Sequence, residues 1–297
     1  MKPKTVDLAR GKWRGILIAL GVDKRHLTGK HAPCPMCEGT DRFRFDNKNG
    51  DGTFICNQCG AGKGFDLLMQ VRGWDFPTAA AEVDKIVGNV RQETAPKRLD
   101  DETARRLKND LWLSASPIHP GDLAHRYLVG RGHYSECNDL RLSDAAPVPH
   151  SRNTCPALLA LVRGIDGSPV NIHRTFLGPN GKADLDNPRA MMPGCIPDGA
   201  AVRLYSAGEV LGIAEGIETA FAAADRFQVP VWSAINSTML AKWTPPEGVR
   251  EVIVFGDCDA KFGGQAAAFA LAHKLSRKLK VRVEIPDAIG TDWADAA

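Results

Sequence analysis

Hydrophobic runs long enough to cross a membrane are missing from this chain of 297 residues. The N-terminal apolar run, GILIALGV at 15–22, is far shorter than the roughly 20 residues that a transmembrane helix needs. The basic segment DKRHLTGK follows it, where a signal peptide would have a small-residue cleavage region. We therefore expect a cytoplasmic protein with no membrane partner.

Cysteine is scarce, and a phosphate-binding loop is absent. Eight cysteines are too few for a disulfide scaffold, and four of them stand in two Cys-x-x-Cys pairs, which favours metal binding in a reducing compartment. The stretch GAGKG at 60–64 has no Ser or Thr after Lys63, which excludes a nucleotide-hydrolysing P-loop there. Internal repeats and low-complexity tracts are also absent.

Net charge is nearly balanced, with 38 basic against 35 acidic side chains, but its distribution is uneven. Residues 1–99 carry 17 basic and 11 acidic side chains, whereas the remainder carries 21 and 24. A basic front and an acidic back suit a polyanion-binding module beside a metal-binding module. Ordinary scatter of surface charge explains the imbalance equally well.

The N-terminal part has the pattern of a zinc ribbon. Each Cys-x-x-Cys pair can turn two thiolates toward one ion, and two pairs complete a tetrahedral site. The segments RFRF (42–45) and TFIC (53–56) between the pairs predict two strands joined by a turn at 49–52. We expect Gly39 and Gly60 to allow the tight turns after each pair, and His31 to lie outside the site. The predicted ligands of a structural Zn²⁺ are Cys34, Cys37, Cys56 and Cys59.

Basic and aromatic side chains alternate along the first of these strands. Alternation places Arg42 and Arg44 on one face and Phe43 and Phe45 on the other, in the small core. Basic side chains on a strand face suit contacts with the phosphates or bases of a single strand. A solvated surface is the alternative.

The C-terminal third predicts a parallel α/β sheet. The segments EVLGIAEG (209–216), VPVWSAI (229–235), EVIVFGD (251–257) and VRVEIP (281–286) predict mainly apolar strands, which alternate with helical patterns at 217–227 and 264–279. Apolar strands that alternate with helices are typical of parallel sheets with right-handed crossovers. We divide the chain into an N-terminal domain (1–88), a linker (89–100), a small subdomain (101–200) and a parallel-sheet domain (201–297).

Acidic residues follow two of these apolar strands. Glu215 follows the first, and Asp257 and Asp259, which share one face by alternation, follow another. Because ligand sites lie at the carboxyl ends of parallel strands, we expect these side chains to converge. Carboxylates this close repel one another, but the arrangement becomes favourable when Mg²⁺ or Mn²⁺ binds between them. Asp292, after the last strand, is a fourth candidate, and a set of solvated loop acids is the alternative.

Three segments of the C-terminal part, AEGIETAFAA, VIVFGDCDAKFGGQAAAFALAHKL and VEIPDAIGTDWAD, resemble the TOPRIM domain of phage and plasmid-type primases. The segment from 33 to 68 is similar to the zinc ribbon of phage and satellite primases, and HRYLVGRG with IHRTFLGPNGKA resembles their intervening subdomain. This resemblance implies an α/β chain made of a zinc ribbon, a small α+β subdomain and a Rossmann-like TOPRIM domain. One departure is Thr219, where bacterial replicative primases have Asp, with Glu218 one step earlier.

The resemblance also implies a function, that of a DNA-directed RNA polymerase. Such a primase makes RNA primers on a single-stranded DNA template from ribonucleoside triphosphates during DNA replication, with a replicative helicase either fused or recruited. A metal-dependent nuclease and a non-catalytic single-stranded DNA-binding protein are the alternatives. By the resemblance Glu215, Asp257 and Asp259 are catalytic and, with Asp292, bind Mg²⁺ or Mn²⁺. The expected contacts to nucleotide and DNA are Arg174, Lys182, Arg189 and Lys261, together with Arg42 and Arg44.

Overall fold

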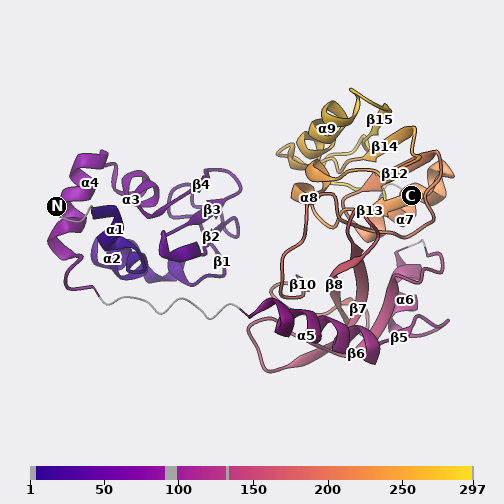
Figure 1. The fold of residues 1–297 in the computed structure, drawn as a ribbon, viewed down its shortest axis with the longest axis horizontal. Coiled ribbons are helices and arrows are strands. Elements are labelled where there is room, and N and C mark those ends of the chain that lie inside the picture. Colours follow the sequence, from indigo (N-terminus) through magenta and orange to yellow (C-terminus); the bar gives the residue numbers. More distant parts are fainter. Residues whose placement is uncertain (1–4, 91–98, 132–133, 296–297) are drawn as a thin grey trace. The chain divides into compact units, whose positions relative to one another are not determined.

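The computed structural model describes residues 5–90, 99–131 and 134–295. The chain divides into two compact units, Met1–Arg98 and Leu99–Ala297, and each is described by itself (Figure 1). Most of the predicted linker, 89–100, lies outside the described residues. The domain boundaries drawn from the sequence stay predictions.

The first unit is built on a four-stranded antiparallel sheet in the order β1-β2-β3-β4. The predicted pairing of the two central strands is confirmed, with Phe43 opposite Cys56 and Phe45 opposite Phe54. All three phenylalanines are buried, as alternation requires. The strands are β1 (His31–Ala32), β2 (Phe43–Phe45), β3 (Phe54–Cys56) and β4 (Gly60–Gly62).

Helices cover this small sheet and share its core. The helix α4 begins after Asp75, whose side chain accepts a hydrogen bond from the backbone amide of Thr78, and has Pro77 in its first turn. Trp13 packs edge-on against Phe65, with 4.7 Å between ring centroids. The helical segments are α1 (Thr5–Ala9), α2 (Trp13–Ala19), the 3₁₀ turn η1 (Lys24–Leu27), α3 (Gly64–Arg72) and α4 (Phe76–Ile86).

The second unit is built on one mixed sheet, in which β10-β8-β7-β11-β13-β12-β14-β15 lie side by side. The last four of these strands are mutually parallel, as predicted, and the others are antiparallel. The short strand β11 pairs with both β7 and β13, so the predicted subdomain and the parallel-sheet domain share a single sheet. The strands are β5 (Ser116–Pro117), β6 (Leu140–Pro147), β7 (Thr154–Arg163), β8 (Pro169–Gly178), β9 (Gly181–Lys182), β10 (Arg189–Met191), β11 (Ala201–Val202), β12 (Val210–Ala214), β13 (Val231–Ser233), β14 (Glu251–Phe255) and β15 (Lys280–Glu284).

Both faces of this sheet are packed. On β7, Leu158 and Val162 belong to the large core beneath the parallel strands, whereas Leu159 and Leu161 belong to a second core that includes Leu111 of α5. In Figure 1 α5 is purple, the antiparallel strands with α6 are magenta to red, and the parallel strands with α7 to α9 are orange to yellow. The helices are α5 (Asp101–Ser114), α6 (Leu123–Gly130), α7 (Ile217–Phe227), α8 (Ser237–Lys242) and α9 (Gly263–Leu275).

In the described parts of the chain, no helix is both long enough and apolar enough to cross a membrane. The expected cytoplasmic location is not tested by this finding and stays a prediction.

Candidate active site and zinc site

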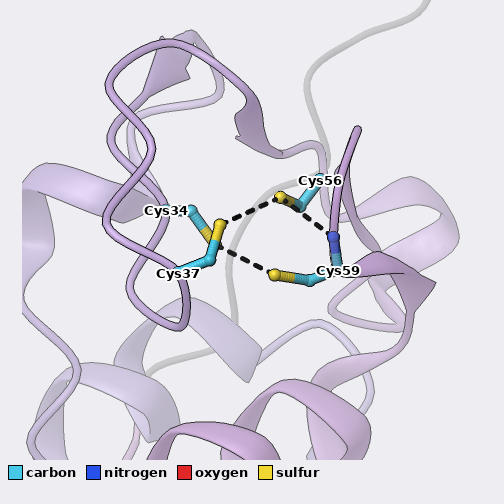
Figure 2. Close-up of side chains that lie close together, drawn as sticks. All are labelled: Cys34, Cys37, Cys56 and Cys59. Atoms are coloured by element: carbon cyan, nitrogen blue, oxygen red, sulfur yellow. Dashed lines mark hydrogen bonds between the residues drawn. The ribbon is translucent and has the colours of Figure 1, made fainter. Parts of the chain in front are cut away.

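The four cysteines of the first unit point toward one another from the two Cys-x-x-Cys turns (Figure 2). Their Sγ atoms all lie within 4.8 Å of one another, with 3.8 Å between Cys34 and Cys59 and 3.8 Å between Cys37 and Cys56. Sulfurs placed tetrahedrally at a Zn–S distance of about 2.3 Å would also be about 3.8 Å apart. The backbone amides of Met36 and Cys59 each donate a hydrogen bond to a cysteine sulfur at 3.4 Å. This geometry fits a closed structural zinc site.

The turns that form the two knuckles differ. The second knuckle turns at Gly60, whose φ of 89° is in the left-handed region that favours glycine, as predicted. The first knuckle turns at Glu38, with φ 55°, so the prediction that Gly39 makes this turn is wrong. An added Cβ at Gly39 would lie 2.1 Å from Nε of Arg42, so the Arg42 side chain would have to move to admit another residue there.

The two predicted nucleic-acid contacts of the ribbon, Arg42 and Arg44, lie on either side of the fully buried Phe43. Arg42 donates a hydrogen bond to the side chain of Gln58, and Nη2 of Arg44 lies 3.9 Å from Oδ2 of Asp46. Both arginines are partly exposed. The expected alternation is therefore confirmed, and contact with DNA stays a prediction.

The second unit brings three acidic segments to one edge of its sheet. The parallel strands β12 and β14 are direct neighbours, so Glu215 and Asp257, which follow them, extend from carboxyl ends that lie side by side. An antiparallel bridge between Cys258 and Thr291 ties the segment that contains Asp292 to the same edge.

These carboxylates act on one another electrostatically. Burial and the charges of Glu215, Asp292 and Asp259 raise the pKa of Asp257 to about 7. Burial and the charge of Asp259 also raise the pKa of Glu215, although a hydrogen bond from the Ser237 amide opposes the rise. Glu215, Asp257, Asp259 and Asp292, which follow strands or bridges at this edge of the sheet, are called the carboxylate cluster.

The carboxylate cluster has a position suited to a divalent cation. Oδ1 of Asp257 is buried without a hydrogen-bond partner among the described residues, which is costly unless a cation or water satisfies it. Within residues 5–90, 99–131 and 134–295, only the four cysteines form a group of three or more ligand atoms all within 4.8 Å. The oxygens of the carboxylate cluster are therefore more widely spaced than the sulfurs of the zinc site. That spread suits Mg²⁺, which keeps several water ligands and takes one or two carboxylates.

Backbone amides orient the outer two acids of the cluster. Gly264 donates to Oδ2 of Asp259 at 2.7 Å, and Ala294 donates to Oδ1 of Asp292 at 2.7 Å. Gly264 must be a glycine, because an added Cβ would lie 2.7 Å from the carbonyl oxygen of Asp257. The backbone thus fixes these carboxylates before any ligand binds.

The loop between β14 and α9 contains an exposed cation and a strained aromatic residue. Lys261, a predicted nucleotide contact, is exposed two residues after Asp259. The next residue, Phe262, is 70% exposed and has φ 60°, a left-handed conformation that costs a non-glycine residue about 1–2 kcal/mol. Strain of this kind gathers at functional sites. A role for Lys261 in nucleotide binding stays a prediction.

Strand register brings Lys182 and Arg189 to one face of β8. Arg189 lies opposite Thr175, and Lys182 lies opposite Leu177. Directly opposed residues share a face, and Thr175 and Leu177 are two residues apart on β8, so both cations lie on that same face.

Arg174 lies on the other face of β8, and the structure does not bring it to the carboxylate cluster. Alternation along the strand puts its neighbour His173 on the site side instead. The Arg174 side chain is 3% exposed and donates to the carbonyl oxygens of Pro147 and Met191. We therefore remove Arg174 from the predicted nucleotide contacts. His173 is neutral at neutral pH, because burial lowers its pKa to about 4.

Two residues of the site, Glu218 and Tyr127, were not among the predicted site residues. The Glu218 carboxylate is 7% exposed and accepts a hydrogen bond from the Tyr127 hydroxyl and another from Arg189 Nη2 at 3.0 Å. Lys182 Nζ lies 3.7 Å from the same oxygen. The segments AEGIETAFAA and HRYLVGRG, which carry the resemblance, contain these two residues, so the signal was present in the sequence.

The raised pKa of Asp257 predicts how the stability of the protein depends on pH. The unfolded side chain ionises near 3.8 and the folded one near 7, so the free energy of unfolding falls as pH rises between these values. Asp257→Asn removes this cost. Without added divalent metal we expect the variant to melt roughly 10 °C above the wild type at pH 8, and equally at pH 4. Thermal unfolding followed by circular dichroism at both pH values checks this, and a variant less stable at pH 8 would contradict it.

Comparison with protein families identifies three matching regions. Residues 29–65 match the zinc-binding domain of primase-helicase, and residues 210–297 match the Toprim domain. Residues 102–204 match a domain of unknown function, DUF7146. The predicted primase-type zinc ribbon and TOPRIM domain are confirmed by these matches, and so is the predicted α/β fold class.

Solved primase structures are also similar to this chain. The zinc-binding and RNA polymerase domains of the Aquifex aeolicus primase are 14% identical, with a TM-score of 0.43, and the match covers 99% of this chain and 81% of that one. The primase fragment of the bacteriophage T7 primase-helicase is 14% identical, with a TM-score of 0.41, and the match covers 90% and 93%.

The cofactors follow from the domains and the geometry. The zinc ribbon with its four-cysteine cluster binds Zn²⁺, and Toprim domains bind Mg²⁺ or Mn²⁺. The chain thus combines domains of primase type, which supports assignment as a primase-type enzyme.

Proposed function

We propose that the protein is a DNA primase that makes short RNA primers on single-stranded DNA by metal-dependent nucleotidyl transfer. The observation that carries the proposal is the carboxylate cluster at the carboxyl ends of β12 and β14, with Arg189 beside it. Arg189 opposes the rise in pKa of both Glu215 and Asp257, so its charge acts on the cluster. Adjacent acids and cations suit a metal-bound triphosphate.

The proposed reaction joins two ribonucleotides. The 3′-hydroxyl oxygen of one nucleotide forms a bond to the α-phosphorus of the next, the bond between the α- and β-phosphates breaks, and pyrophosphate leaves. The hydroxyl proton passes to solvent, and no protein side chain is assigned as its base. When bound, Mg²⁺ or Mn²⁺ supplies orientation of the reactants and neutralisation of the developing charge.

The residues of this chain have distinct proposed roles. Glu215, Asp257 and Asp259 would hold the divalent ion with Asp292, and the buried, unpartnered Oδ1 of Asp257 supports this assignment. Lys182 and Arg189 would bind the anionic triphosphate, and Lys261 would contact nucleotide or template.

The zinc ribbon would contact the template. Arg42 and Arg44 are partly exposed on a strand face and can reach phosphates or bases of a single strand. The proposed partners are single-stranded DNA, ribonucleoside triphosphates and a replicative helicase.

Primer synthesis in vitro tests this function. The protein is incubated with labelled ribonucleotides, unlabelled single-stranded DNA of varied sequence and either Mg²⁺ or Mn²⁺. We expect short labelled RNA that depends on template and metal and is lost in Glu215→Gln. Shortened template without new RNA would indicate a metal-dependent nuclease, and DNA binding without either product would indicate a non-catalytic binding protein.

A further inference from the structure

Glu218 joins two parts of the second unit at a buried position. It is the second residue of α7, and its Oε1 accepts from Tyr127 of α6 and from Arg189 of β10. Lys182 of β9 lies 3.7 Å from the same oxygen. All three partners of Glu218 come from the region before residue 200, whereas Glu218 and the carboxylate cluster come from the parallel-sheet part.

Glu218 stays ionised because the effect of its partners on its pKa is larger than the opposing effect of burial. Burial raises the pKa of a carboxyl, but Arg189, the hydrogen bond from Tyr127 and the charge of Lys182 hold the pKa of Glu218 at about 2. Its position in the first turn of α7 also favours a negative charge. Glu218 is therefore an anion that is already satisfied by protein donors, unlike Asp257, whose Oδ1 has no hydrogen-bond partner among the described residues.

Arg189 faces both Glu218 and the carboxylate cluster. One of its terminal nitrogens donates to Glu218 at 3.0 Å, and its side chain is 45% exposed. A guanidinium has five N–H donors in a fixed plane, so a single anchoring bond leaves further donors for another anion. An anchored cation also loses less conformational entropy when it binds that anion.

We propose that Glu218 is a positioning residue that fixes Arg189 and Lys182 beside the carboxylate cluster for binding the triphosphate, and that it does not ligate the divalent metal. This inference rests on the proposed function and adds how the side chains of Arg189 and Lys182 are held in the proposed site. It also gives a physical reason for the glutamate three residues after Glu215 in this chain.

Equilibrium binding tests the inference with three variants of the zinc-loaded protein. Binding of Mn²⁺ alone is measured by calorimetry, and binding of a fluorescent ATP analogue is measured with Mn²⁺ present. We expect Glu218→Gln to weaken analogue binding about tenfold and Mn²⁺ binding less than threefold, whereas Asp257→Asn weakens Mn²⁺ binding more than tenfold. Tyr127→Phe removes one hydrogen bond to Glu218 but leaves Arg189 and Lys182 in contact with it. This variant should weaken analogue binding less than threefold.

A double-mutant cycle separates positioning from general destabilisation. If Glu218 acts mainly through Arg189, Glu218→Gln should change analogue binding less than threefold in an Arg189→Gln background, where Lys182 alone is still held by Glu218. Full additivity of the two changes would overturn the inference. So would a loss of Mn²⁺ binding in Glu218→Gln as large as that in Asp257→Asn.

The outcome also distinguishes this inference from the proposed function. A wild-type protein that binds Mn²⁺ but no triphosphate would contradict both, because Arg189 and Lys182 would then have no triphosphate to bind. A wild-type protein that binds both ligands, with Glu218→Gln indistinguishable from it, would overturn the positioning role alone. Glu218→Gln should unfold at a lower temperature than wild type, because it breaks a buried ion pair. Circular dichroism at the assay temperature that shows Glu218→Gln still folded establishes that any loss of analogue binding comes from the site.

Discussion

Asp257→Asn is expected to lower the rate of primer synthesis roughly 10³-fold, since a bound metal contributes several kcal/mol to transition-state stabilisation and each 1.36 kcal/mol is a factor of ten. The asparagine keeps the size of the side chain but replaces the unpartnered Oδ1 with a group that cannot carry negative charge. Rates of labelled RNA synthesis on single-stranded DNA at saturating Mn²⁺ measure the effect. The same substitution should not unfold the protein, because it removes repulsion within the carboxylate cluster.

Glu209→Gln is the matched control for this prediction. Glu209 precedes the amino end of β12, the same strand that Glu215 follows, and its side chain is 70% exposed with Arg250 3.6 Å away. An exposed ion pair of this kind contributes little to stability. Glu209→Gln should keep wild-type activity. Activity in Asp257→Asn within threefold of wild type would contradict a metal-binding role for Asp257.

Loss of the zinc site is expected to unfold the first unit. Structural zinc in small zinc-binding domains contributes about 10–16 kcal/mol of binding energy to folding. Cys37→Ser weakens one of four ligands and leaves the other thiolates close together without an ion to neutralise them. We expect bound zinc to fall from about one ion per chain to below a tenth, with residues 5–90 becoming sensitive to limited proteolysis.

Cys195→Ser is the control for the zinc prediction. Cys195 is an exposed cysteine of the second unit and lies outside the four-cysteine cluster, so its loss should change neither zinc content nor proteolysis. Intact zinc stoichiometry and unchanged protease resistance in Cys37→Ser would contradict the assignment of this cysteine as a ligand.

The parts of the fold that depend on local patterns could be predicted from the sequence. The spacing of the cysteines and the alternation around Phe43 predicted the zinc ribbon, and apolar strands alternating with helices predicted the parallel sheet. Helices α1 and α2 were not predicted, because Gly11 and Gly15 interrupt that region and its helical pattern is short. The sequence also did not predict that β11 joins the antiparallel and parallel strands into a single sheet, since a two-residue strand has no sequence pattern of its own.

The acidic side of the site was easier to predict than the cationic side. Glu215 and Asp257 lie within two residues of the ends of apolar strands, so the rule for parallel sheets places them without knowledge of the packing. In the sequence, Arg174 and Arg189 are both basic residues within or near a predicted strand. Only the register of β10 against β8 shows that they lie on opposite faces of the sheet. The partners of Glu218 come from three separate elements, which no local pattern brings together.

The position of manganese in a crystal grown with Mn²⁺ is the most direct test of the whole interpretation. Anomalous scattering should place an ion in contact with Asp257 and at least one further carboxylate of the cluster, at oxygen distances near 2.2 Å for a hard divalent cation. The Glu218 oxygens should stay on Tyr127 and Arg189. Manganese bound elsewhere, with Glu215 and Asp257 turned away from each other, would contradict the proposed metal-dependent polymerase.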